Sequence, residues 1–279
     1  MSFFEIARKE FHATLLSGIL TADETGIPSN ADKGSKISKA IACALLEEIG
    51  DAATAEKLPG QTSGAGFEET CANFLKLCFE QLRHLRCGTF TVAKGGRISD
   101  FDQYTHLDDL ERLAARYPLM AAALGSDYLI KPDVVVGRYP EKDELINRDS
   151  ELVDQGVARL TSIREANQEC LILHASISCK WTIRSDRAQN ARSEGLNLVR
   201  NRKGRLPHIC VVTGEPMPSR IASLALGTGD LDCVYHFALP ELVKSMAKIG
   251  GDDRIEQLQT MIEGKRLRDI SDLPLDLTV

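Results

Sequence analysis

The spacing of apolar residues along the first third of the chain is mostly that of amphipathic helices. Residues 36–49 carry apolar side chains at every third or fourth position, and Gly50 closes the segment. The same spacing recurs over residues 67–85 and 107–123. The intervening stretch 58–66 contains proline and several glycines, which predicts a loop.

The pattern changes in the middle of the chain. Residues 128–136, 170–183, 209–213 and 233–239 form short apolar or alternating runs rich in β-branched side chains, which predicts strands. A helical stretch at 185–201 separates the second run from the third. This order predicts an α/β fold with a central mixed β-sheet flanked by helices.

Neither an internal repeat nor a shift in composition marks a domain boundary. We therefore expect one domain over residues 1–279. It would have a helical part at about 1–125, a sheet core at about 126–240, and a C-terminal helix or tail at 241–279. The charged stretch 137–154 is expected to be an exposed linker.

Composition narrows the class of protein. No apolar run approaches the roughly 20 residues that a membrane span needs, and the N-terminus lacks a signal-peptide pattern. We therefore expect a cytoplasmic protein with no membrane partner. The eight cysteines form no CxxC pair, which argues against structural zinc and a disulfide framework.

Charge is distributed unevenly. The net charge of −6 does not favour nucleic acid as a partner, yet residues 180–205 hold eight basic side chains and two acidic ones. A solvated helix face would produce the same local excess. Charge counts alone therefore leave a DNA-binding surface and an ordinary exposed helix equally open.

Two charged residues, Asp133 and Lys180, fall within predicted strands. Each by itself is explained by a strand end or a solvated edge. Together they match the needs of phosphodiester hydrolysis, in which a divalent cation screens the phosphate and lowers the pKa of the attacking water. Mg²⁺ takes one or two carboxylates with waters and phosphate oxygens, and a lysine can stabilise the developing charge. We expect the two side chains to meet at a shared strand end.

A family resemblance appears in these residues. The Pro-Asp pair ending at Asp133 and the triplet Ser178-Cys179-Lys180 resemble the PD…(D/E)xK nuclease signature, except that Ser178 stands where an acid is expected. Glu194 lies on the following predicted helix and could supply the missing carboxylate. This PD…SxK…E pattern resembles the NgoMIV family of CCGG-recognising type II restriction endonucleases.

The resemblance extends over residues 28–240, through "NADKGS" (30–35), "LPGQTSGAGFEE" (58–69) and residues 215–237. It implies a restriction-endonuclease-like PD-(D/E)xK core and a type II site-specific deoxyribonuclease that needs Mg²⁺, with two ions in each active site. The catalytic residues that it implies are Asp133, Lys180, Glu194, Glu68 and Ser178. The metal ligands that it implies are Asp133, Glu194 and the Cys179 backbone carbonyl.

The segment Arg184-Ser185-Asp186-Arg187 follows the catalytic strand closely. An arginine fork matches N7 and O6 of guanine, and a carboxylate accepts a hydrogen bond from N4 of cytosine. Two arginines around one aspartate therefore match two adjacent C·G pairs, and a two-fold dimer would read CCGG. The alternative is a capped helix start with surface arginines.

The resemblance also implies residues that read the outer base pair. These are Asp32 and Arg220, with Gln61 in the minor groove. The expected site is GCCGGC, cut after the first G to leave 5′ overhangs. The implied assembly on double-stranded DNA is a homotetramer, a dimer of dimers, and no nucleotide cofactor is expected.

Three alternatives remain open at this stage. The first is a PD-(D/E)xK nuclease of other purpose, such as DNA repair or junction cleavage. The second is a non-catalytic DNA-binding module, although all expected catalytic positions carry usable side chains. The third is a phosphate-binding transferase, suggested by the glycines in residues 227–232, but that stretch lacks the lysine and spacing of a P-loop.

Overall fold

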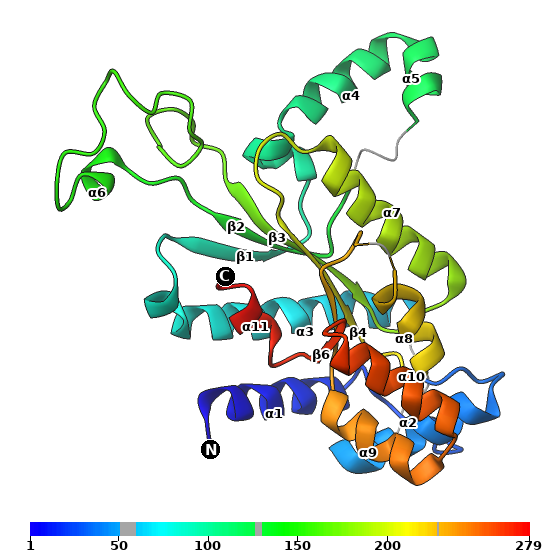
Figure 1. Cartoon of the computed structure of the whole chain (residues 1–279). Coiled ribbons are helices and arrows are strands. Elements are labelled where there is room, and N and C mark those ends of the chain that lie inside the picture. The colour runs from blue at the N-terminus through cyan, green and yellow to red at the C-terminus, as the bar shows by residue number, and fades with distance from the viewer. Residues whose placement is uncertain (51–59, 126–129, 228) are drawn as a thin grey trace.

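The computed structural model describes residues 1–50, 60–125, 130–227 and 229–279 (Figure 1). Its longer helices are α1 (Phe3–Leu16), α2 (Lys36–Ile49), α3 (Gly60–Gln81), α4 (His106–Arg116), α5 (Pro118–Leu124), α7 (Ser185–Asn201), α8 (Pro218–Ala225), α9 (Leu239–Ile249) and α10 (Asp252–Glu263). Short helices are α6 (Asp143–Ile146), α11 (Leu273–Asp276) and the 3₁₀ turns Arg83–Leu85, Ile98–Asp100 and Asp102–Tyr104. The strands are β1 (Phe90–Lys94), β2 (Val134–Arg138), β3 (Ile172–Lys180), β4 (His208–Thr213), β5 (Cys233–His236) and β6 (Leu267–Asp269).

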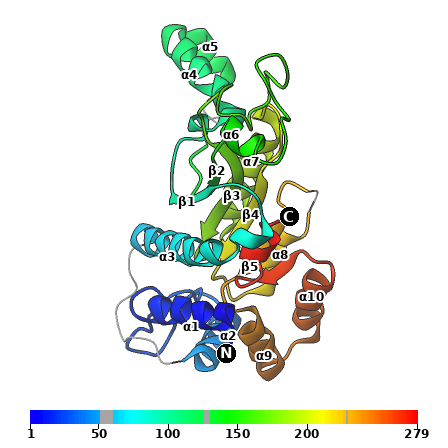
Figure 2. The same cartoon turned by 90° about the vertical axis from the view of Figure 1, so that its left-hand side faces the viewer.

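Six strands of the described chain form one sheet in the order β1-β2-β3-β4-β5-β6. The β1–β2 and β2–β3 pairs are antiparallel, whereas β3 to β6 run parallel to one another. Helix α3 packs against β1, β2 and β3 on one face, and α7 and α8 lie on the other (Figure 2). The predicted α/β class, a mixed sheet between helices, is confirmed.

The strand directions bring distant parts of the sequence together. Since β2 and β3 are antiparallel, the beginning of β2 lies beside the end of β3, with Val134 paired to Ile177. Since β3 and β4 are parallel, Lys180 at the end of β3 lies beside Thr213 at the end of β4. One end of the sheet therefore collects Asp133, Lys180 and the segment that follows β4.

Aromatic packing anchors helix α3 to this end of the sheet. The ring of Trp181, one residue past β3, lies 5.0 Å from that of Phe67 and 5.6 Å from that of Phe237. All three side chains are buried. Tilted aromatic contacts at such distances contribute more than their area alone. The packing fixes α3 beside the strand end that carries Lys180.

Two helix predictions match the structure at both ends. In α2, the Ser35 hydroxyl accepts a hydrogen bond from the Ser38 backbone N–H, and Gly50 ends the helix at φ 139°. That backbone conformation favours glycine over any other residue. Helix α7 has the predicted bounds of 185–201, with Arg184 as its extended N-cap residue and Asp186 in its first turn.

Other boundaries were wrong. The loop predicted at 58–66 is helical from Gly60, because packing overrides weak local propensity and Gly66 lies close against Ile19; residues 58 and 59 are outside the described chain. The helix predicted at 107–123 is broken, because Pro118 disfavours helical backbone at Tyr117, where φ is −127° and ψ is 96°.

The strand predicted at 128–136 begins only at Val134, so Asp133 directly precedes the strand; residues 128 and 129 lie outside the description. The predicted strands 170–183 and 233–239 are shorter, at 172–180 and 233–236. Strands β1 and β6 lie outside the range 126–240 expected for the sheet. The C-terminal part thus contributes a strand as well as helices.

The stretch 137–154, expected to be an exposed linker, contains the end of β2 and the short helix α6. Its Asp143 forms an ion pair with Arg164, at 2.6 Å between Oδ2 and Nη2. No helix in the described ranges combines the length and the apolar character needed to cross a bilayer.

Candidate functional site

Asp133 is the centre of a hydrogen-bond cluster at the end of the sheet. Its Oδ2 atom accepts hydrogen bonds from the Cys179 backbone N–H at 2.7 Å, the Lys180 ammonium at 3.0 Å and the Ser178 hydroxyl at 3.3 Å. None of these three bonds uses Oδ1. The predicted meeting of Asp133 and Lys180 at a shared strand end is thus present in the structure.

Glu194 reaches the same cluster from helix α7. Its Oε2 lies 3.3 Å from the Ser178 hydroxyl, which is also 3.3 Å from Asp133. A serine hydroxyl has one proton, so it donates to only one of these two carboxylates at a time. Ser178 therefore joins the two acids, although it stands at the position where the nuclease signature has an acid.

The cluster is largely removed from water. Side-chain exposure is 15% for Lys180 and 21% for Asp133. Burial raises the pKa of Glu194; Lys180 opposes this effect and Asp133 adds to it. Burial acts to lower the pKa of Lys180, but Asp133 and Glu194 outweigh it and the pKa is raised, so the ammonium is charged at neutral pH.

Glu68 lies at the edge of this cluster, on helix α3. Burial raises its pKa, and the negative charge of Asp133 raises it further. Its Oε2 lies 3.9 Å from the ammonium of Lys94, the last residue of β1. Lys94 also donates a hydrogen bond to the Ala65 carbonyl at 2.8 Å, which ties β1 to α3. Glu68 is thus close enough to Asp133 for the two negative charges to interact.

The donors fit a divalent cation. Within the described residues, no group of three or more His, Cys, Asp or Glu side chains gathers closely enough to hold a metal alone. Asp133 and Glu194 offer two carboxylates joined by one hydroxyl, and hard oxygen donors are what Mg²⁺ prefers. Mg²⁺ usually keeps waters and takes phosphate oxygens, so two protein carboxylates are sufficient.

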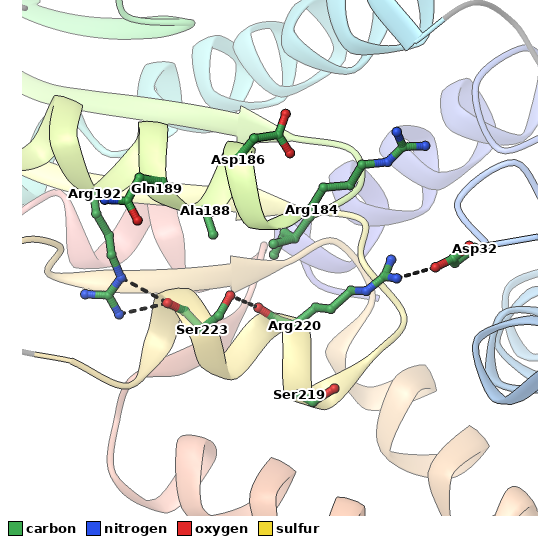
Figure 3. Close-up of a pocket in the computed structure, with 10 residues that line it drawn as sticks. Asp32, Arg184, Asp186, Ala188, Gln189, Arg192, Ser219, Arg220 and Ser223 are labelled. Atoms are coloured by element: carbon green, nitrogen blue, oxygen red, sulfur yellow. Dashed lines mark hydrogen bonds and ion pairs between the residues drawn. The ribbon is translucent and has the colours of Figure 1, made fainter. Parts of the chain in front are cut away.

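A pocket of about 670 Å³ lies beyond the end of β3, between α7, α8 and the Asp32 loop (Figure 3). It is lined by Asp32, Ile183, Arg184, Asp186, Ala188, Gln189, Arg192, Ser219, Arg220 and Ser223. Arg184 and Asp186 are exposed at the N-terminal end of α7. Four of the predicted DNA-contacting residues, Asp32, Arg184, Asp186 and Arg220, therefore share one concave surface.

Asp32 and Arg220 are paired with each other. The Arg220 guanidinium donates a hydrogen bond to Asp32, although the two residues are 188 positions apart in the sequence. Arg220 holds the pKa of Asp32 below its usual value, helped by a hydrogen bond from the Gly34 N–H and by the charges of Arg220 and Arg184. The Asp32 carboxylate and the Arg220 guanidinium are thus held side by side.

Three predicted DNA contacts have side chains outside the part of the structure that is described. Gln61 lies in the first turn of α3, and Ser185 and Arg187 lie in the first turn of α7. The Cys179 side chain is buried, and the neighbouring Cys71 thiol of α3 and burial raise its pKa, consistent with a packing role.

Sequence reasoning did not single out two charged residues at this end of the sheet. Lys94 had no signal beyond a five-residue alternating run. Glu215 follows β4, and its side chain is completely buried. The signal for Glu215 was a lone acid between an apolar strand and a proline, which is too weak to interpret without the fold.

Comparison with known proteins gives one consistent family. The family described as NgoMIV restriction enzyme matches residues 11–279. The type II restriction enzyme NgoMIV of Neisseria gonorrhoeae is 52% identical over 282 residues, covering 99% of each chain. A solved chain described as a PspGI restriction endonuclease–substrate DNA complex aligns at a TM-score of 0.35 and 16% identity, covering 98% of this chain and 89% of that one. That last similarity is too low to add to the family match.

Proposed function

This chain belongs to the NgoMIV restriction enzyme family and is a type II restriction endonuclease, and we propose that it cuts double-stranded DNA at GCCGGC. Cleavage requires Mg²⁺ and falls after the first G, leaving 5′ overhangs. The observation that carries this proposal is the convergence of Asp133, Glu194 and Lys180 on one strand end, with the Ser178 hydroxyl between the two acids.

The reaction is hydrolysis of one phosphodiester bond in each strand. A water oxygen bonds to phosphorus, the P–O3′ bond breaks, and the products are a 5′-phosphate and a 3′-hydroxyl. A divalent metal supplies screening of the phosphate charge and lowers the pKa of the attacking water. Asp133 and Glu194 are the side chains that would hold it, with the Cys179 carbonyl as a further oxygen ligand and Glu68 acting through water. Two ions in each active site are part of the proposal.

Lys180 has a separate role. Its ammonium lies 3.0 Å from Asp133 and is charged at neutral pH because of the neighbouring acids. A fixed positive charge in a site largely removed from water stabilises negative charge as it develops on the phosphate. The same ammonium orients the attacking water. Ser178 holds the two carboxylates in register.

Base recognition starts four residues after Lys180. Arg184 and Arg187 take the guanines of two adjacent C·G pairs, and Asp186 accepts from the cytosine amines. Arg220 and Asp32, already side by side, take the guanine and cytosine of the outer pair. Gln61 contacts the minor groove. A palindromic site requires two copies related by a two-fold axis, and we propose a homotetramer of two such dimers.

The family assignment favours this function over the other candidates. It disfavours a DNA-binding module without catalysis and a nuclease of repair or junction cleavage. It also disfavours the phosphate-binding transferase considered from residues 227–232.

Digestion of matched plasmids tests the proposal. One plasmid carries GCCGGC and the other carries ACCGGT at the same position, each incubated with Mg²⁺ and with a chelator. We expect cleavage of the first plasmid only, dependent on Mg²⁺, and sequencing of the ends gives the cut position. Equal cleavage of ACCGGT would overturn the outer-pair assignment. Light scattering tests the tetramer, and a stable dimer active on one site would contradict it.

A further inference from the structure

Glu215 is a buried acid in the segment between β4 and α8. Its side chain has no exposed surface. The carboxylate accepts hydrogen bonds from the Ile183 backbone N–H at 2.8 Å and the Met217 backbone N–H at 3.2 Å. Its Oε2 lies 3.8 Å from Nη1 of Arg220. One carboxylate thus contacts two separate parts of the chain, Ile183 before α7 and the start of α8.

Each of these parts leads to a proposed DNA-reading residue. Ile183 directly precedes Arg184, the N-cap residue of α7. Met217 is the N-cap residue of α8, the helix that carries Arg220. Arg220 in turn is paired with Asp32. Glu215 therefore fixes the position of Arg220, the proposed reader of the outer base pair, relative to Arg184, a proposed reader of the inner pairs.

The residues next to Glu215 connect it to the catalytic strand. The Thr213 hydroxyl donates to the Lys180 carbonyl at 2.8 Å and accepts from the Glu215 N–H at 3.1 Å. The Gly214 carbonyl accepts from the Asn30 side-chain amide at 2.9 Å, which fixes the segment leading to Asp32. A Cβ on Gly214 would lie 2.4 Å from the Trp181 ring, so the segment can sit this close to β3 only with glycine there.

A buried carboxylate is costly unless its oxygens are satisfied. Burial raises the pKa of Glu215 to about 7, opposed by the Ile183 and Met217 N–H groups and by the charge of Arg220. An apolar side chain would fill the same space without that cost. It would, however, leave the Ile183 N–H buried without an acceptor and would free Arg220 from one of its two acidic neighbours, Asp32 and Glu215.

We propose that Glu215 is a positioning residue that couples reading of the outer base pair to catalysis, by fixing Arg220 and the Ile183–Arg184 turn relative to Lys180. This inference rests on the proposed function, because it assumes that Arg220 and Asp32 read the outer pair. It predicts that loss of Glu215 harms discrimination at the outer pair more than at the inner pairs.

The test compares Glu215→Gln with wild type by single-turnover cleavage at saturating enzyme. Substrates are duplexes carrying GCCGGC, the outer-pair variant ACCGGT and a variant with one inner pair changed. In an assay at about pH 8, above the pKa of Glu215, Glu215→Gln removes the negative charge facing Arg220 and replaces one hydrogen-bond acceptor by a donor. We expect the GCCGGC-to-ACCGGT rate ratio to fall about tenfold, with a smaller change in inner-pair discrimination.

A matched control separates positioning from stability. Asp269 is another buried acid, which accepts a backbone hydrogen bond from Leu239 at 3.0 Å and pairs with Arg8, and neither partner is a proposed DNA contact. Asp269→Asn should lower the thermal unfolding midpoint without changing the rate ratio. Glu215→Asp is the second variant: it keeps the charge but is too short to reach both N–H donors, so a smaller fall in the ratio is expected.

Arg220→Ala distinguishes failure of this inference from failure of the proposed function. If Arg220→Ala keeps the wild-type ratio, the outer-pair assignment itself is wrong. If the GCCGGC-to-ACCGGT rate ratio falls in Arg220→Ala but stays at the wild-type value in Glu215→Gln and Glu215→Asp, the coupling through Glu215 is overturned. If coupling holds, adding Glu215→Gln to Arg220→Ala should reduce the ratio no further, because both changes remove one interaction.

Discussion

Two clusters in this molecule contain one basic and two acidic side chains, but they are built differently. At the proposed active site, Lys180 lies with Asp133 and Glu194. At the same end of the sheet but three strands away, at the edge strand β6, Arg8 of α1 lies with Glu241 of α9 and Asp269 of β6. Arg8 donates two hydrogen bonds to each acid, at 2.5–2.8 Å to Glu241 and 2.9 Å to Asp269. Lys180 donates one hydrogen bond, to Asp133.

The pKa values of Glu241 and Asp269 in the Arg8 cluster and of Glu194 in the Lys180 cluster shift in opposite directions. Burial acts to raise the pKa of Glu241 and of Asp269, but Arg8 outweighs it and both pKa values are lowered. Burial raises the pKa of Glu194, and Lys180 does not offset it. The planar guanidinium can serve two carboxylates at once, whereas an ammonium acts as a point charge.

The difference shows what each cluster is suited to do. The Arg8 cluster is electrostatically complete and holds α1, α9 and β6 together. The Lys180 cluster keeps a carboxylate whose charge is not fully compensated, next to the proposed DNA surface. An added divalent cation would complete it.

The largest effect should come from removing Asp133. Asp133→Asn keeps the size of the side chain but removes the charge on which Lys180, Ser178 and Cys179 converge. We expect cleavage to fall by more than about 10³-fold, while specific binding measured with Ca²⁺ is retained. Cleavage at the wild-type rate would remove Asp133 from the catalytic set.

Removal of Arg8 should damage the fold and spare the chemistry. Arg8→Ala leaves Glu241 and Asp269 buried without their partner, and we expect a loss of about 3 kcal/mol in the free energy of unfolding. The cleavage rate of the folded fraction should not change. The matched control is Arg97→Ala, because Arg97 pairs with Asp108 and Glu111 at the surface, and its loss should leave the free energy of unfolding nearly unchanged.

Neutralising one acid in each cluster should change stability in opposite directions. The pKa of Glu194 is raised in the fold, so its ionisation destabilises the folded state as pH rises above the ordinary value of 4.5. Glu194→Gln should therefore raise the unfolding midpoint at pH 8 in a chelator, by roughly 2 °C, and the gain should vanish near pH 4.

The pKa of Glu241 is lowered in the fold, so its ionised carboxylate stabilises the folded state above pH 4.5. This stabilisation is lost as the pH falls through the lowered pKa. Glu241→Gln should therefore lower the midpoint at pH 8. Thermal melts of both variants across pH 4–8 measure the contrast. A shift of the same sign in both variants would contradict the difference between the clusters.

The smallest effect should come from Ser178. Its hydroxyl makes one hydrogen bond at a time, worth about 1 kcal/mol, and supplies no charge. Ser178→Ala should slow cleavage about fivefold, measured under single-turnover conditions with saturating Mg²⁺. A loss as large as that of Asp133→Asn would mean that the hydroxyl takes part directly in the chemistry.

The sequence carried enough information to predict the meeting of Asp133 and Lys180. Both were predicted to lie within strands, and in the fold Asp133 directly precedes β2 while Lys180 ends β3. The antiparallel pairing of β2 and β3 brings these two positions together. The position of Glu194 near this strand end could also be predicted, because helix α7 follows β3 after a short turn and has the predicted bounds. The positions of the strands and of helix α7 follow from local periodicity, whereas the meeting of Asp133 and Lys180 was inferred from the needs of phosphodiester hydrolysis. The choice of Glu194 as the displaced acid came from the resemblance to the nuclease signature.

Contacts made by tertiary packing could not be predicted in this way. The Arg220–Asp32 pair joins residues 188 positions apart, and only the family resemblance linked them. Glu215 had no periodic pattern to mark it as buried. The early start of α3 at Gly60 could not be predicted either, because its first residues have low helix propensity and a tertiary contact, that of Gly66 with Ile19, lies within this segment.

The central claim is that Asp133 and Glu194, from different elements, serve one metal position. It is tested most directly by the Mg²⁺ dependence of GCCGGC cleavage in wild type and Glu194→Gln. The claim predicts that Glu194→Gln needs at least about tenfold more Mg²⁺ for half its maximal rate, or does not cut at all. A Glu194→Gln enzyme with the same maximal rate and the same Mg²⁺ dependence as wild type would contradict it.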